Sequence, residues 1–272
     1  MKNNILWDCH VHSSFSADSL TPLKNMIQQA ESLGMEGICI TEHLDPDYPE
    51  TPDHTVFTLD LPSYKETLLE LRELYQNKLD VRFGIELGMQ PHLSSYFNQL
   101  VSEEGFDFVI ASSHVVKNFD PYYPEYFEQY EEATAYRYYF ESILENLENL
   151  DFANVYGHLD YIVRYGPNKN RFYTYEAYQD IMDEILQTLI KKQVGIELNT
   201  GGFHYGLGEP NPSISVLKRY RELGGEIITI GSDAHKAEDL TRYFDKAEDI
   251  LKDCGFRYYT VFKERKPQFI KL

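Results

Sequence analysis

The sequence predicts an α/β fold in which a parallel sheet is buried on both faces. Seven short apolar runs, rich in Ile, Val, Phe or Tyr, alternate with helical patterns along the 272 residues. This alternation predicts parallel strands joined by right-handed crossovers. The runs are nearly continuous in apolar character, which is typical of a barrel or of a doubly wound sheet. No linker or break in composition interrupts them, so we expect a single domain over residues 1–272, a length common for α/β barrels.

The strands are predicted from the apolar runs themselves. They cover residues 5–11, 37–41, 81–87, 106–111, 154–157, 194–199 and 226–231. After the last helix, residues 256–272 are expected to form an extended closing segment with a basic tip at 263–266.

The helices are predicted from capping signals and from apolar residues on one face. In the first, Thr21 is the expected N-cap, Pro22 takes the first helical position and Gly34 ends the helix. In the second, over residues 63–76, Ser63 and Glu66 form a capping box. The others are predicted over residues 91–103, 131–150, 174–193, 213–223 and 238–253.

Two connections, residues 44–61 and 115–130, are too long to be simple turns. The first contains several prolines and acidic residues, and the second is rich in Tyr, Phe and Pro. Long loops in a compact α/β domain often close over a site, although irregular loops without a function also occur. Both interpretations stay open for these two segments.

Composition limits the classes of partner. The sequence has 25 Lys and Arg against 44 Asp and Glu, a net charge of −19, which argues against a nucleic-acid-binding surface. It has no run of eighteen apolar residues and no signal-like N-terminus, so we expect a cytoplasmic protein with no membrane partner. Cys9, Cys39 and Cys254 lack metal-site spacing; Cys9 and Cys39 lie in apolar runs and are expected in the core.

Polar residues gather where the predicted strands end. His10 and His12 are two residues apart, so their side chains point to the same face of a strand. Six of the nine histidines lie at such strand ends, namely His10, His12, His43, His114, His158 and His235. Glu86 and Asp233 accompany them. The carboxyl ends of parallel strands form one face of the fold, where α/β active sites are built.

Buried imidazoles and carboxylates at such density would carry a large desolvation cost unless a cation neutralised them. Nitrogen and carboxylate ligands without thiolate suit Zn²⁺, Mn²⁺ or Fe²⁺. A catalytic ion takes about three protein ligands, so eight candidates, or nine with Asp18, predict two to three ions. The alternative is a polar network without metal.

The motifs at these strand ends resemble those of the polymerase and histidinol phosphatase (PHP) superfamily. They are His10-x-His12, Thr41-Glu42-His43, Gly84-Ile85-Glu86, Ser113-His114, Gly157-His158 and Ser232-Asp233-Ala234-His235. The resemblance covers nearly the whole chain and implies a distorted (β/α)7 TIM-like barrel with a metal cluster at the C-terminal ends of the strands. Phe15-Ser16-Ala17-Asp18 and the segment YGHLDYIVRYG, residues 156–166, are similar to the monofunctional histidinol-phosphate phosphatases.

Carried over to this sequence, the resemblance implies three metal sites. The first would use His10, His12, Glu86 and Asp233, the second Glu86, His114 and His158, and the third Asp18, His43 and His235. Arg164 would bind the substrate phosphate and act in catalysis. Asp18, His43 and His235 are candidates for protonating the leaving group.

One position departs from the family pattern. Where relatives tend to have a second arginine after the sixth strand, this sequence has His204, which would hold a phosphate only when protonated. Glu42 and Asp160 are further candidates for binding the substrate or for orienting imidazoles, as is Thr41 for orientation; packing roles are the alternative.

The function implied is hydrolysis of a small phosphorylated metabolite, L-histidinol phosphate, to L-histidinol and phosphate by metal-bound hydroxide. Its cationic end would meet the acidic and aromatic side chains of the two long loops: Asp45, Asp47, Asp120, Tyr122, Tyr123 and Glu125. The alternatives are a nuclease, a protein-tyrosine phosphatase of the same superfamily, and a metal-binding module that has lost catalysis. The sequence does not predict an oligomeric state.

Overall fold

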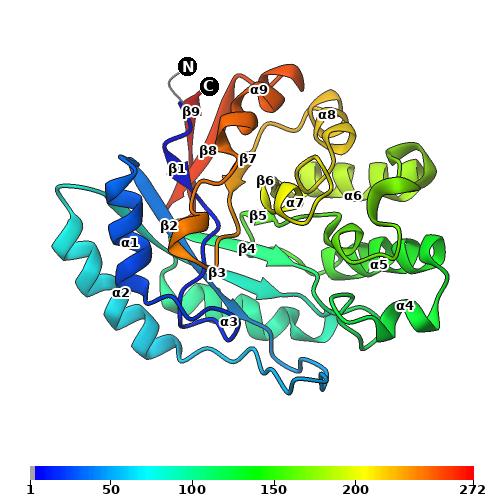
Figure 1. The fold of residues 1–272 in the computed structure, drawn as a ribbon, viewed down its shortest axis with the longest axis horizontal. Helices are drawn as coiled ribbons and strands as arrows, with labels where there is room; N and C mark the ends of the chain where they lie inside the picture. The colour runs from blue at the N-terminus through cyan, green and yellow to red at the C-terminus, as the bar shows by residue number, and fades with distance from the viewer. Residues whose placement is uncertain (1–3) are drawn as a thin grey trace.

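The computed structural model describes residues 4–272 and contains a seven-stranded parallel sheet (Figure 1). Each strand pairs with the next along the chain, in the order β1 to β7. The strands are β1 (Trp7–Asp8), β2 (Gly37–Leu44), β3 (Asp80–Gly88), β4 (Phe108–Ser112), β5 (Val155–Tyr156), β6 (Gly195–Asn199) and β7 (Ile228–Gly231). All seven lie within or overlap the runs predicted from apolar character.

The sheet curves until its first and last strands meet. The Cys9 amide donates to the Ile230 carbonyl at 2.9 Å, and the His12 amide donates to the Ala234 carbonyl at 2.9 Å. A parallel bridge between Val11 and Ala234 continues this contact. The sheet is therefore a nearly closed, distorted barrel rather than a doubly wound sheet, which confirms the (β/α)7 fold class.

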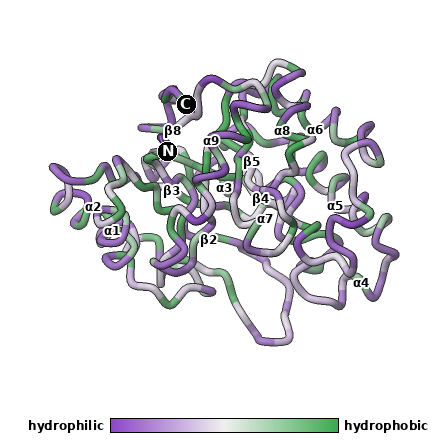
Figure 2. Tube along the Cα trace, turned by 45° about the horizontal axis from the view of Figure 1, so that its top comes forward, coloured by the Kyte–Doolittle hydropathy of each residue, from purple (hydrophilic) through white to green (hydrophobic). Residues whose placement is uncertain are grey.

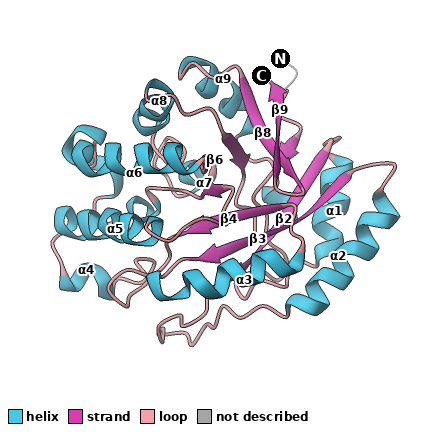
Figure 3. Ribbon diagram, turned by 180° about the vertical axis from the view of Figure 1, so that it is seen from behind, coloured by secondary structure: helices cyan, strands magenta, loops and turns pink. Residues whose placement is uncertain are grey.

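Helices surround the barrel on its outside (Figures 1 and 3). They are α1 (Leu23–Ser32), α2 (Leu61–Tyr75), α3 (Ser94–Glu104), α4 (Glu125–Gln129), α5 (Glu132–Leu147), α6 (Gln179–Lys192), α7 (Gly201–His204), α8 (Ile214–Glu222) and α9 (Phe244–Asp253). Hydrophilic residues dominate the peripheral α2 and α4 (Figure 2). The buried faces of the larger helices pack on the strands, as Met26 and Ile27 of α1 do.

Two predicted helix caps are wrong. Pro22, not Thr21, is the N-cap of α1, because the Thr21 hydroxyl donates to the carbonyl of His235 at 3.2 Å. Helix α2 begins two residues earlier than predicted, since the Asp60 carboxylate accepts from the Ser63 amide at 3.2 Å. At α1 the hydroxyl expected to cap the helix bonds to His235 instead. At α2 the capping oxygen comes from Asp60 rather than from Ser63.

The C-terminal segment forms an antiparallel hairpin, β8 (Tyr258–Lys263) and β9 (Lys266–Lys271), which lies beside β1 (Figures 1 and 3). The hydroxyl of Thr260 accepts from the Ile228 amide of β7 at 3.3 Å, so the hairpin is attached to the barrel. The three cysteines are buried and unpaired, as expected for Cys9 and Cys39. Among residues 4–272, no helix has both the length and the apolar character needed to cross a membrane.

The two long loops meet above the carboxyl ends of the strands. The Tyr48 hydroxyl in the first loop contacts the Asp120 carboxylate in the second. The Tyr123 hydroxyl of the second loop donates to Asp53 of the first at 2.7 Å. Both loops contribute residues to the wall of one cavity, so they form a cover over it.

Candidate active site

The predicted histidines converge at the carboxyl ends of the barrel strands, and Glu86 of β3 lies at their centre. Five imidazoles place a ring nitrogen within 3.4 Å of the Glu86 carboxylate: His10, His12, His43, His114 and His158. Its Oε2 lies 3.0 Å from Nε2 of His10, and its Oε1 lies 2.9 Å from Nε2 of His158. The two oxygens face different imidazoles, which is the arrangement of a carboxylate that bridges two sites.

Asp233 follows β7 and has the left-handed backbone conformation, with φ of 59°. Its Oδ1 lies 3.6 Å from Nε2 of His10 and 3.5 Å from Nε2 of His12. Its Oδ2 accepts from Nη1 of Arg164 at 2.9 Å. Asp233 therefore connects the histidine cluster to the arginine that was predicted to bind phosphate.

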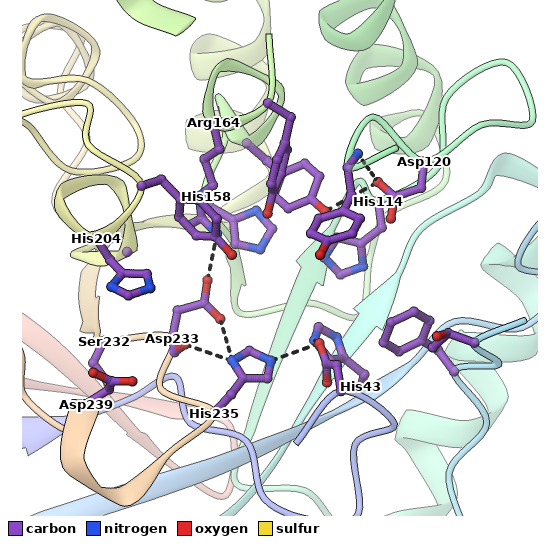
Figure 4. A pocket seen from close by; sticks show the side chains of 18 of the residues that line it. His43, His114, Asp120, His158, Arg164, His204, Ser232, Asp233, His235 and Asp239 are labelled. Carbon is purple, nitrogen blue, oxygen red and sulfur yellow. Dashed lines mark hydrogen bonds and ion pairs between the residues drawn. The ribbon is translucent and has the colours of Figure 1, made fainter. Parts of the chain in front are cut away.

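A second group of side chains lies toward the solvent side of the cluster. Oδ2 of Asp18 is 3.1 Å from Nε2 of His235 and 3.6 Å from Nε2 of His43. The imidazole of His12 stacks against those of His43 and His235, with ring centroids 4.1 and 4.3 Å away, and the latter two rings lie 5.7 Å from each other. Figure 4 shows His43 and His235 facing the pocket beside Asp233.

The ligand atoms form four overlapping groups rather than three separate ones. They are His10–His12–Glu86, His10–His158–Asp233, His43–Glu86–His114 and His12–His43–His235. These groups contain eight of the nine predicted metal ligands, and Asp18 joins them through His235 and His43, so all nine lie in one cluster. His12 and His43 each border more than one group, so the division of the ligands into three sets stays a prediction.

Residues outside the predicted set orient these imidazoles. Nδ1 of His10 donates to Glu197 of β6 at 2.7 Å, and Nδ1 of His114 donates to Asp45 at 2.7 Å. These bonds direct the Nε2 atoms toward Glu86, as carboxylates commonly do for metal-binding histidines. Glu197 was not among the site residues predicted from the sequence. The signal was an acidic residue in an otherwise apolar strand, two positions before Asn199 and so on the same face.

Glu42 was predicted to bind substrate or to orient an imidazole. It is buried, lies outside the wall of the cavity, and accepts hydrogen bonds from Ser13 and Ser16. The hydroxyl of Ser16 lies 3.2 Å from Nδ1 of His12. Glu42 therefore acts on His12 through Ser16, and burial raises the pKa of its carboxyl.

Asp160, the other candidate of this kind, is also buried and also outside the cavity wall. It accepts from Nδ2 of Asn211 at 2.5 Å, and Oδ1 of Asn211 in turn accepts from Nε of Arg164 at 2.8 Å. Nη2 of Arg164 donates to Asn199 at 2.9 Å. Asp160 therefore positions Asn211, which in turn positions the guanidinium of Arg164. Arg164 itself lines the cavity.

Opposing charges compensate one another in the cluster. Burial alone would raise the pKa of Glu86, but His10 and His43 hold that pKa well below its usual range. Burial alone would likewise raise the pKa of Asp233, which His10, His12 and Arg164 keep low. Burial would lower the pKa of His235, yet Asp18 raises it to about 9. The carboxylates are therefore ionised and available as ligands.

The cluster fits divalent metal ions. Nε2 of His12, Nδ1 of His43 and Nε2 of His235 are buried and make no hydrogen bond to any of residues 4–272. Buried polar atoms without a partner are costly, and each of these points toward a carboxylate and another imidazole. Nitrogen and oxygen donors in this number suit two to three ions of zinc, manganese or iron.

The cluster opens into a cavity of about 370 Å³, within the range of small-molecule sites. Arg164 and His204 lie on one side of this cavity, and Asp120 lies on the opposite side (Figure 4). His204 was expected to hold phosphate when protonated. Its Nδ1 instead accepts from Nη1 of Arg242 at 2.7 Å, so the imidazole is neutral in this arrangement.

The opposite wall is acidic and aromatic. Asp120 is buried there among the hydroxyls of Tyr48 and Tyr161, and burial raises the pKa of its carboxyl to about 6. Tyr122 and Tyr123 line the same wall, as expected. Of the three other acidic residues expected to face a cationic group, Asp45 alone lines the cavity wall, and its Oδ2 makes no hydrogen bond to any of residues 4–272. Asp45 accepts from His114, Asp47 pairs with His92 at 3.0 Å, and Glu125 lies outside the cavity wall.

Comparison with known proteins gives the same family as the motifs. Residues 8–201 match the PHP domain family. The histidinol-phosphatase of Lactococcus lactis is 34% identical over 260 residues, which are 95% of this chain and 95% of that protein. A probable histidinol-phosphatase from Clostridium acetobutylicum is 29% identical over 262 residues, 96% of this chain and 98% of the other.

Solved structures agree with these matches. The crystal structure of the Lactococcus lactis histidinol phosphate phosphatase, complexed with zinc, L-histidinol and phosphate, superposes with a TM-score of 0.87 at 31% identity. The superposition covers 97% of this chain and 99% of that one. A putative histidinol phosphatase from Listeria monocytogenes shares the fold, with a TM-score of 0.77 at 20% identity, over 88% of this chain and 99% of the other. With its family match, its metal-ligand motifs and its barrel together, the chain belongs to the PHP domain family.

Proposed function

We propose that the protein is a histidinol-phosphatase that hydrolyses L-histidinol phosphate to L-histidinol and phosphate. One observation carries the proposal. The histidine–carboxylate cluster lies in a covered cavity of about 370 Å³ with an arginine on one side and a buried acidic, aromatic wall on the other. Histidinol phosphate has a matching polarity, because it carries a phosphate at one end and an amine and an imidazole at the other.

Two to three divalent ions would be held by the nine clustered ligands, with Glu86 between them. When bound, such ions act as Lewis acids on the phosphate and lower the pKa of a coordinated water. The chain itself prepares the ligands. Glu197 and Asp45 accept hydrogen bonds from Nδ1–H of His10 and His114, which leaves the opposite nitrogens free to bind metal.

Arg164 would bind the phosphate. Its guanidinium is buried, and Asp233, Asn199 and Asn211 each accept one hydrogen bond from it. Nη1 and Nη2 each keep a second N–H for a ligand, in a fixed fork that matches phosphate oxygens. Because the side chain is already ordered, little conformational entropy is lost when it binds the transition state.

The leaving alkoxide needs a proton. Asp18, His43 and His235 lie on the solvent side of the cluster and line the cavity, so each is placed near a departing group. We assign the proton transfer to this trio. Within the trio, Asp18 lies 3.1 Å from Nε2 of His235 and raises the pKa of that imidazole to about 9.

The opposite wall would receive the cationic end of the substrate. Above pH 6 the Asp120 carboxylate is ionised, and the rings of Tyr122, Tyr161 and Tyr165 stand around it. Carboxylates and aromatic faces both attract cations in a closed pocket. The loop contacts between Tyr48 and Asp120 and between Tyr123 and Asp53 leave little room for a phosphotyrosyl peptide.

The net charge of −19 supports the expectation that no nucleic acid is a partner. The cytoplasmic location and the single domain over residues 1–272 stay predictions.

The test compares kcat/KM of the metal-reconstituted protein for histidinol phosphate, a phosphotyrosyl peptide and a sugar phosphate. We expect a clear preference for histidinol phosphate. A preference for the phosphotyrosyl peptide would assign the protein to the tyrosine phosphatases instead, and no hydrolysis of any of the three would favour a metal-binding module.

Arg164→Ala tests the phosphate contact within the same assay. It should lower kcat/KM for histidinol phosphate about 100-fold, as does the loss of one transition-state donor in other hydrolytic sites. Arg137→Ala is the matched control, because Arg137 pairs on the surface with Asp180 and does not line the cavity. Equal rates for the two variants would remove Arg164 from the site.

A further inference from the structure

The turn between β7 and α9 brings a second arginine to the cavity. Arg242 lines the cavity wall together with Thr200, Gly201 and His204, which follow β6. Its Nη1 donates to Nδ1 of His204 at 2.7 Å. Because this bond leaves His204 neutral, the positive charge at this point of the wall belongs to Arg242.

Arg164 borders the same short helix from its other side. Its guanidinium stacks 5.0 Å from the ring centroid of Tyr205, next in sequence to His204. A Cβ atom built on Gly201 would lie 3.1 Å from Nη2 of Arg164. Both arginines therefore lie against helix α7. Figure 4 places Arg164, His204 and Asp239, the ion-pair partner of Arg242, on one side of the pocket and Asp120 on the other.

The backbone around Arg242 is held in an unfavourable conformation. Thr241 and Tyr243 both have the left-handed conformation, with φ of 59° and 64°. A left-handed β-branched or aromatic residue is strained and persists only where its surroundings determine it. Here the Thr241 amide donates to Asp8 at 3.2 Å, and the Thr200 hydroxyl donates to the Arg242 carbonyl at 2.8 Å. Strain of this kind concentrates at functional sites.

The guanidinium retains donors for a ligand. Its contacts with His204 and with Asp239, at 2.8 Å, both use Nη1. Nε and Nη2 make no hydrogen bond to any of residues 4–272, and the side chain is 42% exposed, so a ligand in the cavity can reach them. Asp239 and His204 hold one edge of the guanidinium, and the opposite edge is free to bind an anion.

We infer that Arg242 is the second cationic residue that binds the phosphoryl group, and that it supplies the charge which neutral His204 lacks. The inference rests on the proposed function, since it concerns the anionic end of the same substrate. Arg242 contacts the non-bridging oxygens and acts on binding, while His204 and Asp239 position it.

The experiment measures separately how the metal-loaded protein binds the two products. For Arg242→Ala we expect the inhibition constant of inorganic phosphate and the KM for histidinol phosphate to rise about tenfold, the effect of losing a hydrogen bond to a charged group. The inhibition constant of L-histidinol should stay unchanged, because histidinol lacks the phosphate. Arg257→Ala is the control, since Arg257 is exposed and lies outside the cavity.

A rescue variant separates a charge effect from a disturbed turn. Position 204 is in direct contact with the Arg242 guanidinium, so His204→Arg in the Arg242→Ala background returns a guanidinium to the same part of the wall. We expect phosphate binding to recover in this double variant, although the turn remains altered.

Several outcomes would overturn the inference while leaving the proposed function intact. In the first, the Arg242→Ala variant hydrolyses histidinol phosphate and binds phosphate as well as the Arg257→Ala variant does. In the second, phosphate binding is weakened only when Lys236, which lines the same wall, is changed. A rise in the inhibition constants of phosphate and histidinol alike would indicate a structural role and also contradict it. Failure of the unmodified protein to hydrolyse histidinol phosphate would instead count against the proposed function.

Discussion

Individual carboxylates in this site titrate differently because their neighbours differ. Glu86 and Asp120 are both buried, and burial by itself raises the pKa of each. Glu86 has His10 and His43 beside it, which reverse the effect and hold its pKa well below the usual range. Asp120 has tyrosine hydroxyls beside it and only a weaker attraction from His114, so its pKa stays raised at about 6. Glu86, the predicted metal ligand, therefore stays ionised, whereas the carboxyl of Asp120 in the cavity wall is harder to ionise because it is buried.

The raised pKa of Asp120 predicts a pH-dependent stability difference. The folded protein binds this proton more tightly than the unfolded chain does, so the contribution of Asp120 to stability falls as the pH rises from 3.8 to about 6 and is constant above. The shift corresponds to about 3 kcal/mol. Asp120→Asn does not titrate, so its free energy of unfolding relative to the unmodified protein should increase over that pH range and then level off.

Urea unfolding of the two proteins at several pH values between 4 and 7 measures this difference. Asp249→Asn serves as the control, because Asp249 is exposed on α9 and lies outside the cavity wall. If the difference for Asp120→Asn were constant over the whole range, the carboxyl would not carry a raised pKa.

At the scale of secondary structure, the strand ends bring the ligands close enough to share ions. β2 continues to Leu44, three residues beyond its predicted end, so Glu42 and His43 belong to the strand and not to the following loop. Gly231 at the end of β7 allows the barrel to close tightly. A methyl group there would collide with Oε1 of Glu197 and with Cβ of His10.

Gly231→Ala should therefore disturb the metal site through the strand. The added methyl would push Glu197 away from Nδ1 of His10, and overpacking of this kind costs about 1–3 kcal/mol. We expect a lower melting temperature and fewer bound metal ions per chain, measured by calorimetry and elemental analysis.

Gly105→Ala is the matched control for that change. Gly105 ends α3 with φ of 73° and has open space around it, so a methyl there strains the backbone without reaching the cluster. It should lower stability by about 1 kcal/mol and leave the metal content unchanged. Equal metal content in the two variants would show that the contact between Gly231 and Glu197 does not matter for the site.

For the whole molecule, the barrel collects nine ligand residues from His10 to His235 around one centre. Such a site is stable only when its charges and unpaired nitrogens are compensated. Bound ions would therefore stabilise the folded protein and not only supply its chemistry, because a ligand that binds only the folded state raises stability.

Elemental analysis should find two to three divalent transition-metal ions per chain. Removing them with a chelator should abolish hydrolysis and lower the melting temperature by about 5 °C or more, and adding zinc or manganese should restore both. Glu86→Gln should reduce the metal content, whereas His54→Ala should not, since His54 is exposed outside the cluster. Full activity with one ion or none would contradict the cluster.

The sequence by itself determined the order of strands and the residues at their ends. Apolar runs of strand length and helical spacing between them are local properties, so they can be identified without knowing which segments meet. In parallel strands the carboxyl ends share one face, so the positions of His10, His43, His114 and His158 along the chain already predict their convergence. The cap at Thr21 was predicted wrongly because the partner of its hydroxyl, the His235 carbonyl, is distant in sequence. The cap at Asp60, three residues before Ser63, was a local signal that the predicted capping box left out.

Only the tertiary structure decided which distant side chains act on these ligands. Glu197 reaches His10 across 187 positions, and Arg242 reaches His204 across 38, through the closing of the barrel and a strained turn. No periodicity in the sequence encodes such contacts, because they depend on how packed elements place their side chains in space. The same is true of Asp45, whose acidic character suggested a substrate contact and whose burial against His114 makes it a support for a ligand.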